Sequence, residues 1–85
     1  MRLFGIFDKV SGHYLAWLVE ANLGTCTRAI KSRFANSNFD TFSGDFALYH
    51  LADVDDTTGV ISSVEPLLCC TFDEIFRSTD DAVGE

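Results

Sequence analysis

The chain opens with two runs of aromatic and aliphatic residues, RLFGIFD at positions 2–8 and HYLAWLVE at positions 13–20. Both runs are short and rich in residues that favour strands. The segment between them contains Gly12, which can adopt the positive φ of a tight turn. This pattern predicts a β-hairpin.

The second run is apolar on both faces of the strand that it predicts. Leu15, Trp17 and Val19 fall on one face, and Tyr14, Ala16 and Leu18 fall on the other. We therefore expect this strand to be central in its sheet, with a helix over one face and a second cover, such as a partner subunit, over the other. A chain of 85 residues scarcely supplies that second cover itself, which favours a homodimer.

The next segment has the spacing of an amphipathic helix. Cys26, Ala29, Ile30 and Phe34 recur at helical intervals, and Thr25 is a suitable N-cap. The pattern predicts a helix over residues 25–36, followed by a polar loop.

A second hairpin is predicted by strand-like runs at positions 46–54 and 60–64, joined by the turn DDTTG. A calcium loop starting at Asp53 is an alternative interpretation of the acidic turn. Such a loop needs Gly at its sixth position and Glu at its twelfth, where this chain has Thr58 and Val64. The hairpin is the better interpretation, and we expect no metal and no other cofactor.

Near the C-terminus, Thr71 and Glu74 have the T-x-x-E spacing of a capping box and predict a short helix. The expected fold is α+β, a four-stranded antiparallel sheet from two hairpins in the order β-β-α-β-β, with one main helix and a short C-terminal helix. We expect one domain over residues 1–77 and an acidic, flexible tail over residues 78–85.

Composition and charge narrow the possible functions. No apolar run approaches the length needed to cross a bilayer, so we expect a soluble protein with no membrane partner. The three cysteines are an odd number and are most simply buried thiols of a reducing compartment. Because the sequence suggests neither a Ser-His-Asp or Cys-His set nor a phosphate-binding glycine loop, an enzyme is not expected.

The formal charge of −7 is unevenly distributed. Residues 1–40 hold five basic residues against three acidic ones, whereas residues 41–85 hold one basic residue against ten acidic ones. Proteins that bind nucleic acids usually carry the opposite sign, so any such role would depend on a local basic patch.

Several strings of this sequence resemble those of one phage family. They are FDKVSGHY at positions 7–14, AIKSRF at positions 29–34, and above all DFALYHLADVDDTTGVI at positions 45–61. Their order is similar to that in the small non-structural proteins of gokushovirus-type microviruses (Microviridae), which are bacteriophages with single-stranded DNA. The resemblance implies a protein of the host bacterial cytoplasm that is absent from the mature capsid and acts in viral DNA replication or packaging.

That resemblance implies DNA binding but assigns no residue to it, so the candidate residues follow from side-chain types alone. Single-stranded DNA is bound by cations that follow the phosphates and aromatics that stack on bases. The candidates for nucleic-acid binding are Arg28, Lys31, Arg33, Lys9 and Arg2, with Tyr14, Trp17 or Tyr49 as aromatic partners. Among these, the closely spaced Arg28, Lys31 and Arg33 are expected to form the centre of the site, and Trp17 and Tyr49 are expected in the core.

A second hypothesis makes the protein an adaptor or modulator whose acidic surface binds a basic phage or host protein. Its candidate residues are Asp53, Asp55, Asp56, Asp73, Asp80 and Asp81.

Overall fold

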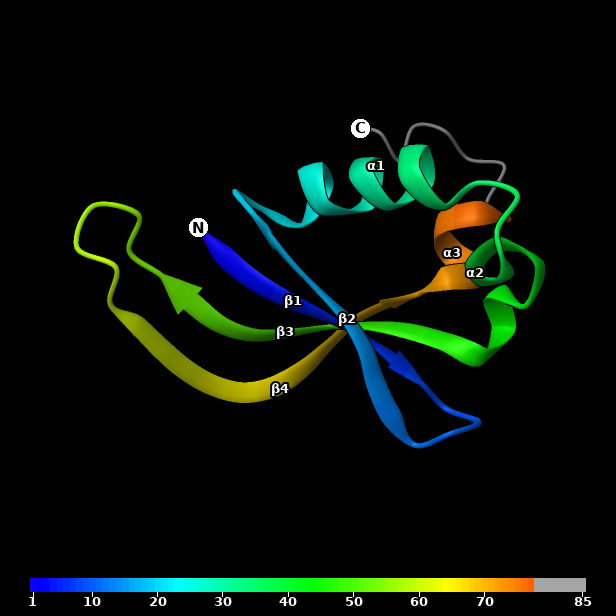
Figure 1. The fold of residues 1–85 in the computed structure, drawn as a ribbon, viewed down its shortest axis with the longest axis horizontal. Helices are drawn as coiled ribbons and strands as arrows, with labels where there is room; N and C mark the ends of the chain where they lie inside the picture. Colours follow the sequence, from blue (N-terminus) through cyan, green and yellow to red (C-terminus); the bar gives the residue numbers. More distant parts are fainter. Residues whose placement is uncertain (78–85) are drawn as a thin grey trace.

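A computed structural model describes residues 1–77 of the chain (Figure 1). The elements in chain order are β1 (Arg2–Asp8), β2 (His13–Glu20), α1 (Leu23–Phe34), α2 (Asn38–Thr41), the 3-10 helix η1 (Ser43–Asp45), β3 (Phe46–Val54), β4 (Ile61–Thr71) and α3 (Phe72–Phe76). The predicted α+β fold, with four antiparallel strands, one main helix and a short C-terminal helix, is confirmed. The tail predicted over residues 78–85 lies outside the described residues.

The strands form one antiparallel sheet in the order β2-β1-β3-β4. The prediction that the second strand is central was therefore wrong, because β2 pairs only with β1 and lies at an edge. The central strands are β1 and β3. The first strand is also apolar on both faces, and it takes the central place by pairing with β2 on one side and with β3 on the other.

The fourth strand is longer than predicted. It begins at Ile61, continues past Pro66 and ends at Thr71. Proline is tolerated because β4 is an edge strand with a bulge, where a missing N–H costs no ladder hydrogen bond. In that bulge, residues 64–66 stand opposite the single Leu51 of β3, and a second register shift follows near Cys69.

The caps of the helices explain where they begin. The main helix starts two residues earlier than predicted, because Asn22 rather than Thr25 is its N-cap. The Asn22 side chain accepts a hydrogen bond from the Thr25 backbone N–H, and the Thr25 side chain completes a capping box. The capping box of Thr71 and Glu74 on α3 is confirmed. The predicted polar loop contains α2, capped by Ser37, and η1.

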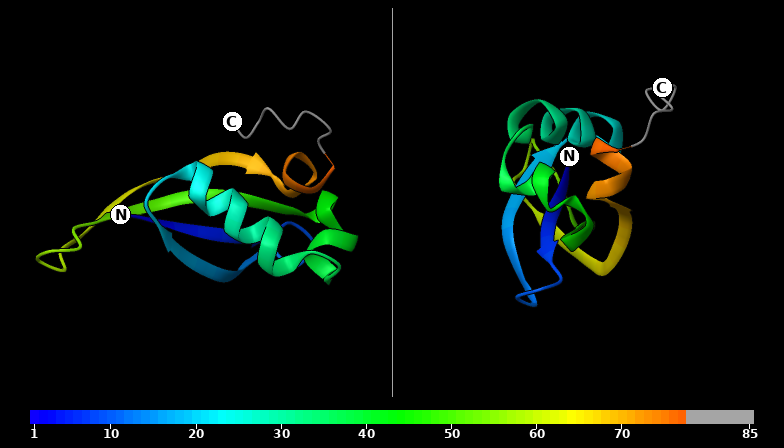
Figure 2. Two further views of the ribbon diagram at one scale, coloured as in Figure 1. Left: turned by 90° about the horizontal axis from the view of Figure 1, so that it is seen from above. Right: turned by 90° about the vertical axis from the view of Figure 1, so that its right-hand side faces the viewer.

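All the helices lie on one face of the sheet (Figures 1 and 2). The core between them and the sheet consists of Phe4, Ile6, Leu18, Cys26, Ile30, Phe46, Leu48, Phe72 and Ile75. Phe4 and Phe72 are the largest fully buried side chains. Full burial of each stabilises the fold by about 1.5–3 kcal/mol. Within the described residues, no helix covers the other face of the sheet, which we call the open face.

Candidate functional site

A bulge in β2 determines which of its aromatic side chains lie on the open face. Phe7 pairs with Tyr14 whereas Ile6 pairs with Ala16, so Leu15 is an extra residue without its own partner on β1. The extra residue interrupts the predicted alternation between Tyr14 and Ala16, so Tyr14 lies on the same face as Trp17. The assignment of Tyr14 and Trp17 to opposite faces was therefore wrong.

Four aromatic side chains from three strands meet on the open face. Phe7 and Tyr14 pack edge to face with ring centroids 5.1 Å apart, and Tyr49 lies 6.0 Å from each of them. Trp17 lies 6.5 Å from Tyr14 and is inclined to it by 30°. We call Phe7, Tyr14, Trp17 and Tyr49 the aromatic platform. Their separations are those of interacting aromatic pairs, so the rings support one another's positions.

The aromatic platform packs over Gly5 of β1. A Cβ atom on Gly5 would lie 2.6 Å from Leu51 Cδ1 and 2.8 Å from Tyr14 Cδ1. Gly5 pairs with Trp17 on one side and with Tyr49 on the other. The missing side chain therefore lets Tyr14 and Leu51 pack directly against the backbone of β1.

Trp17 is accessible although a core position was expected for it. Its exposed fraction is 58%, whereas the neighbouring Leu18, which points to the helices, is 7% exposed. Tyr49 is half-buried, and so is Tyr14. Partial burial raises the pKa of the Tyr14 hydroxyl, with a smaller contribution from Tyr49. The platform thus presents one exposed indole beside rings that are held more firmly.

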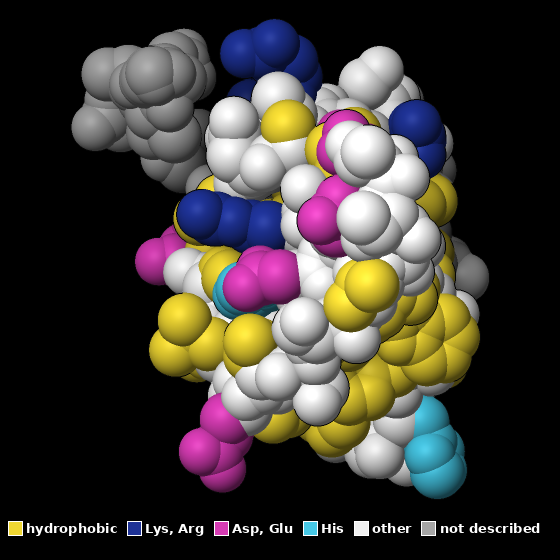
Figure 3. All heavy atoms as spheres, turned by 90° about the vertical axis from the view of Figure 1, so that its left-hand side faces the viewer, with side chains coloured by type: hydrophobic (Ala, Val, Ile, Leu, Met, Phe, Trp, Pro, Cys, Tyr) yellow, Lys and Arg dark blue, Asp and Glu magenta, His cyan; other side chains and the backbone are white. Residues whose placement is uncertain are grey.

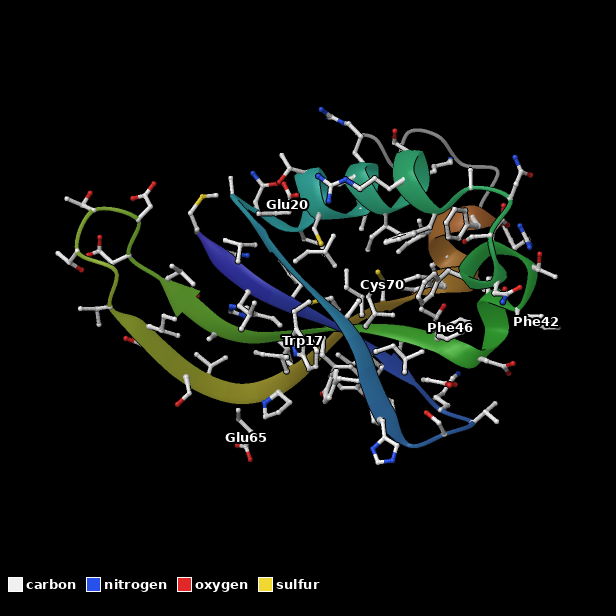
Figure 4. All side chains as sticks on the ribbon, in the orientation of Figure 1. Trp17, Glu20, Phe42, Phe46, Glu65 and Cys70 are labelled. Atoms are coloured by element: carbon white, nitrogen blue, oxygen red, sulfur yellow. The ribbon has the colours of Figure 1, made fainter. Side chains whose placement is uncertain are left out.

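The five basic candidates are all exposed but do not form one site with Tyr14. Arg28, Lys31 and Arg33 lie on α1, which covers the opposite face of the sheet from Trp17. Figure 3 shows Lys and Arg side chains chiefly at the top, on the side of the helices, although basic atoms also lie lower down beside acidic side chains; hydrophobic side chains are more frequent in the lower part. In Figure 4, Cys70 lies between the sheet and the helices, whereas Trp17 and Glu65 lie on the other side.

The remaining two cations lie at the ends of β1. Lys9 is exposed in the turn after β1, where its backbone N–H donates to the carbonyl of Asp45. Arg2 begins β1 between two acidic neighbours, Glu20 and Asp53, which reduce its local positive potential. Among residues 1–77, none of the five basic candidates forms an ion pair with a carboxylate.

The acidic candidates serve the local structure. Asp55 accepts hydrogen bonds from the backbone N–H groups of Thr57 and Thr58, which lower the pKa of its carboxyl group. Asp53 lies 3.0 Å from His50 Nε2, and Asp73 accepts a hydrogen bond from Ser43. Asp80 and Asp81 lie outside the described residues. The described members of the proposed acidic face are therefore distributed between the turn, β3 and α3.

The cysteines are free thiols with little nucleophilic character. Cys26 is buried, while Cys69 and Cys70 are half-buried. Burial is the main cause that raises the pKa of Cys26 and of Cys70 to about 12, with Glu20 and Glu74 as the next largest contributors respectively. Both groups are thus protonated at neutral pH, which disfavours covalent catalysis through them.

The part of the chain that the structure describes contains no group of three or more His, Cys, Asp or Glu side chains arranged to hold a metal ion. It also contains no helix that is long and apolar enough to cross a membrane.

The sequence analysis did not include Phe7 in the platform, nor Gly5 as the position beneath it. A glycine inside an otherwise apolar strand indicates close approach of another group, and this signal could have located the centre of the open face. The bulge at Leu15 had no comparable signal in the sequence.

Fold and site together define a small α+β protein with an uncovered sheet face that carries clustered aromatics. A family model described as Phage ORF5 protein matches residues 1–75. The chain therefore belongs to this family of phage proteins. No curated protein and no solved structure matches it.

Proposed function

We propose that this phage protein binds single-stranded DNA on the aromatic platform during genome replication or packaging. The observation that carries the proposal is the 58% exposure of Trp17 beside Tyr14 on the open face. An exposed hydrophobic ring normally carries a cost in water, and stacking on an unpaired base would remove that cost. Sheet surfaces with exposed aromatics bind single strands in this way, and every base offers a π-face.

The charge distribution determines whether base stacking or phosphate contacts contribute more to the proposed DNA binding. With a net charge of −7 and the basic helix on the far side from Trp17, the platform offers few partners for phosphates. Lys9 is the candidate cation in the turn that joins β1 to β2, the two strands that carry most of the platform. One or two phosphate contacts give a log–log salt slope of about −0.7 to −1.4, whereas a strand bound along α1 would show about −2 or steeper. Stacking, rather than counterion release, would dominate the affinity.

The experiment uses the single tryptophan of the chain as its reporter. Oligo-dT is titrated into the protein at several salt concentrations, and quenching of Trp17 fluorescence is followed. A fluorescently labelled oligo-dT then reports the affinity of variants by anisotropy. We expect Trp17→Ala to weaken binding roughly 5- to 150-fold, because stacking contributes about 1–3 kcal/mol per base.

The matched variant is the pair Arg28→Gln with Lys31→Gln on α1. Under the proposal it weakens binding only slightly and leaves the salt slope nearly unchanged. If instead it flattens the slope by about 1.4 while Trp17→Ala has no effect, DNA binds to α1 and the platform assignment is wrong. Undetectable binding of the wild type at low salt would remove the DNA proposal and favour the acidic-adaptor hypothesis.

A further inference from the structure

The two edges of the sheet differ in how well they are protected against pairing with another strand. Exposed edges carry unpaired N–H and C=O groups, and proteins commonly protect them with proline, charge and bulges. β4 has all three devices, in Pro66, Glu65 and the bulge over residues 64–66. It also has a second register shift near Cys69.

β2 has less of this protection, because its bulge at Leu15 lies near the start of the strand and leaves the rest of the edge regular. From Ala16 to Glu20 it pairs with β1 without a register shift. It contains no proline, and Glu20 at its end is its one acidic residue. Figure 2 shows β2 at one margin of the sheet and β4 towards the other, while the described helices lie over one face of the sheet. The free edge therefore consists of a regular segment that can accept another strand.

The side chains along this edge are apolar and exposed. Leu15, Trp17 and Val19 have exposed fractions of 47%, 58% and 48%. Trp17 and Val19 lie two apart in the regular part of β2 and point to the same face, and the exposed Leu15 precedes them at the bulge. A strand added beside β2 would cover part of each of them.

We infer that the partner of this edge is a second copy of the chain, paired antiparallel through β2 about a two-fold axis near Trp17. This arrangement sets Leu15 of one protomer beside Val19 of the other, so the contact is apolar and self-complementary. Antiparallel pairing also places the two Glu20 carboxylates at opposite ends of the contact, about 20 Å apart along the strands. The seam therefore places no two Glu20 carboxylates side by side, although each chain carries a charge of −7.

The contact gives a dimer with one continuous eight-stranded sheet and leaves the open face uncovered. The proposed dimer is inferred from the difference in protection between the β2 and β4 edges, and it does not depend on DNA binding. If both proposals hold, the two aromatic platforms lie side by side on the same face, with the two indoles adjacent across the seam.

Light scattering and sedimentation on the full-length protein, without DNA, test the inference. We expect a species of twice the 9.4 kDa chain mass that dissociates on dilution. Leu15→Lys combined with Val19→Lys places like charges across the seam and should give a monomer with unchanged circular dichroism. Leu15→Lys combined with Val19→Glu places opposite charges across the seam and should restore the dimer.

The control is Leu67→Lys on β4, which alters a leucine that is 61% exposed on the protected edge. It should leave the dimer intact. A monomeric wild type at all concentrations would overturn the inference. A dimer that survives the two lysines, or that the Lys–Glu pair does not restore, would show that β2 is not paired in this way. Because these measurements contain no DNA, their failure leaves the DNA proposal to its own test.

Discussion

Substitution of Gly5 by alanine tests the close packing beneath the aromatic platform. The new methyl group would lie 2.6 Å from Leu51 Cδ1 and 2.8 Å from Tyr14 Cδ1. Carbon atoms in favourable contact are about 3.5–4.0 Å apart, so one or both side chains must move by about 1 Å. Overpacking of this kind costs about 1–3 kcal/mol, while replacing glycine in a strand gains about 0.5–1 kcal/mol. We therefore expect Gly5→Ala to lower the free energy of unfolding by about 0.5–2 kcal/mol.

Urea denaturation of Gly5→Ala, Leu51→Ala and the double variant forms a double-mutant cycle. Leu51→Ala removes the nearer of the two clashing atoms, so the double variant should be more stable than the sum of the single effects predicts, by about 1 kcal/mol. Gly5→Ala should also weaken oligo-dT binding, because displaced Tyr14 no longer supports Trp17. Additive effects within about 0.5 kcal/mol, or a net stabilisation by Gly5→Ala, would refute the proposed packing.

Two further predictions concern titratable groups. Hydrogen bonds from Thr57 and Thr58 lower the pKa of the Asp55 carboxyl group in the folded chain. The ionised carboxylate therefore stabilises the fold fully above the ordinary Asp pKa of 3.8, and this stabilisation is lost as the pH falls through the lowered pKa. Urea denaturation should therefore show Asp55→Ala less stable than the wild type at neutral pH, with the difference shrinking at acidic pH. Burial raises the pKa of Cys26 and Cys70 to about 12, so both thiols should react slowly with a thiol reagent at pH 8 until urea unfolds the chain. Fast labelling of either in the native protein would contradict this.

The fold could be predicted because its local signals agree with one another. Gly12 and Gly59 have the positive φ values, 77° and 81°, that their turns require. The strands Arg2–Asp8, His13–Glu20 and Phe46–Val54 have the bounds that their alternating or apolar patterns predicted. The capping box on α3 was also correct, because a T-x-x-E spacing directly determines the hydrogen bonds that form there.

What could not be predicted depends on contacts between distant segments. The place of β2 at an edge follows from the pairing of β1 with β3, and no local pattern encodes that choice. From the sequence alone, Pro66 indicates the end of a strand, because proline is tolerated only at an edge or a bulge and neither can be recognised without the sheet. The bulge at Leu15 has the largest consequence, because a single extra residue moves Tyr14 onto the face of Trp17 and creates the platform.

Together, the proposed dimer through β2 and the aromatic platform on the open face would explain how a chain with a charge of −7 binds single-stranded DNA. One platform with a single exposed indole and few nearby cations would bind only weakly, since each stacked base contributes about 1–3 kcal/mol. In the proposed dimer, pairing through β2 would join two platforms rigidly, and a strand held on the first would then meet the second at a high effective concentration. The increase in affinity requires no additional positive charge. Affinity for oligo-dT should therefore rise with the fraction of dimer, and the two-lysine variant on β2 should bind more weakly than the Lys–Glu variant even though it carries the more positive charge. The opposite order would show that charge, rather than the joined platform, governs DNA binding.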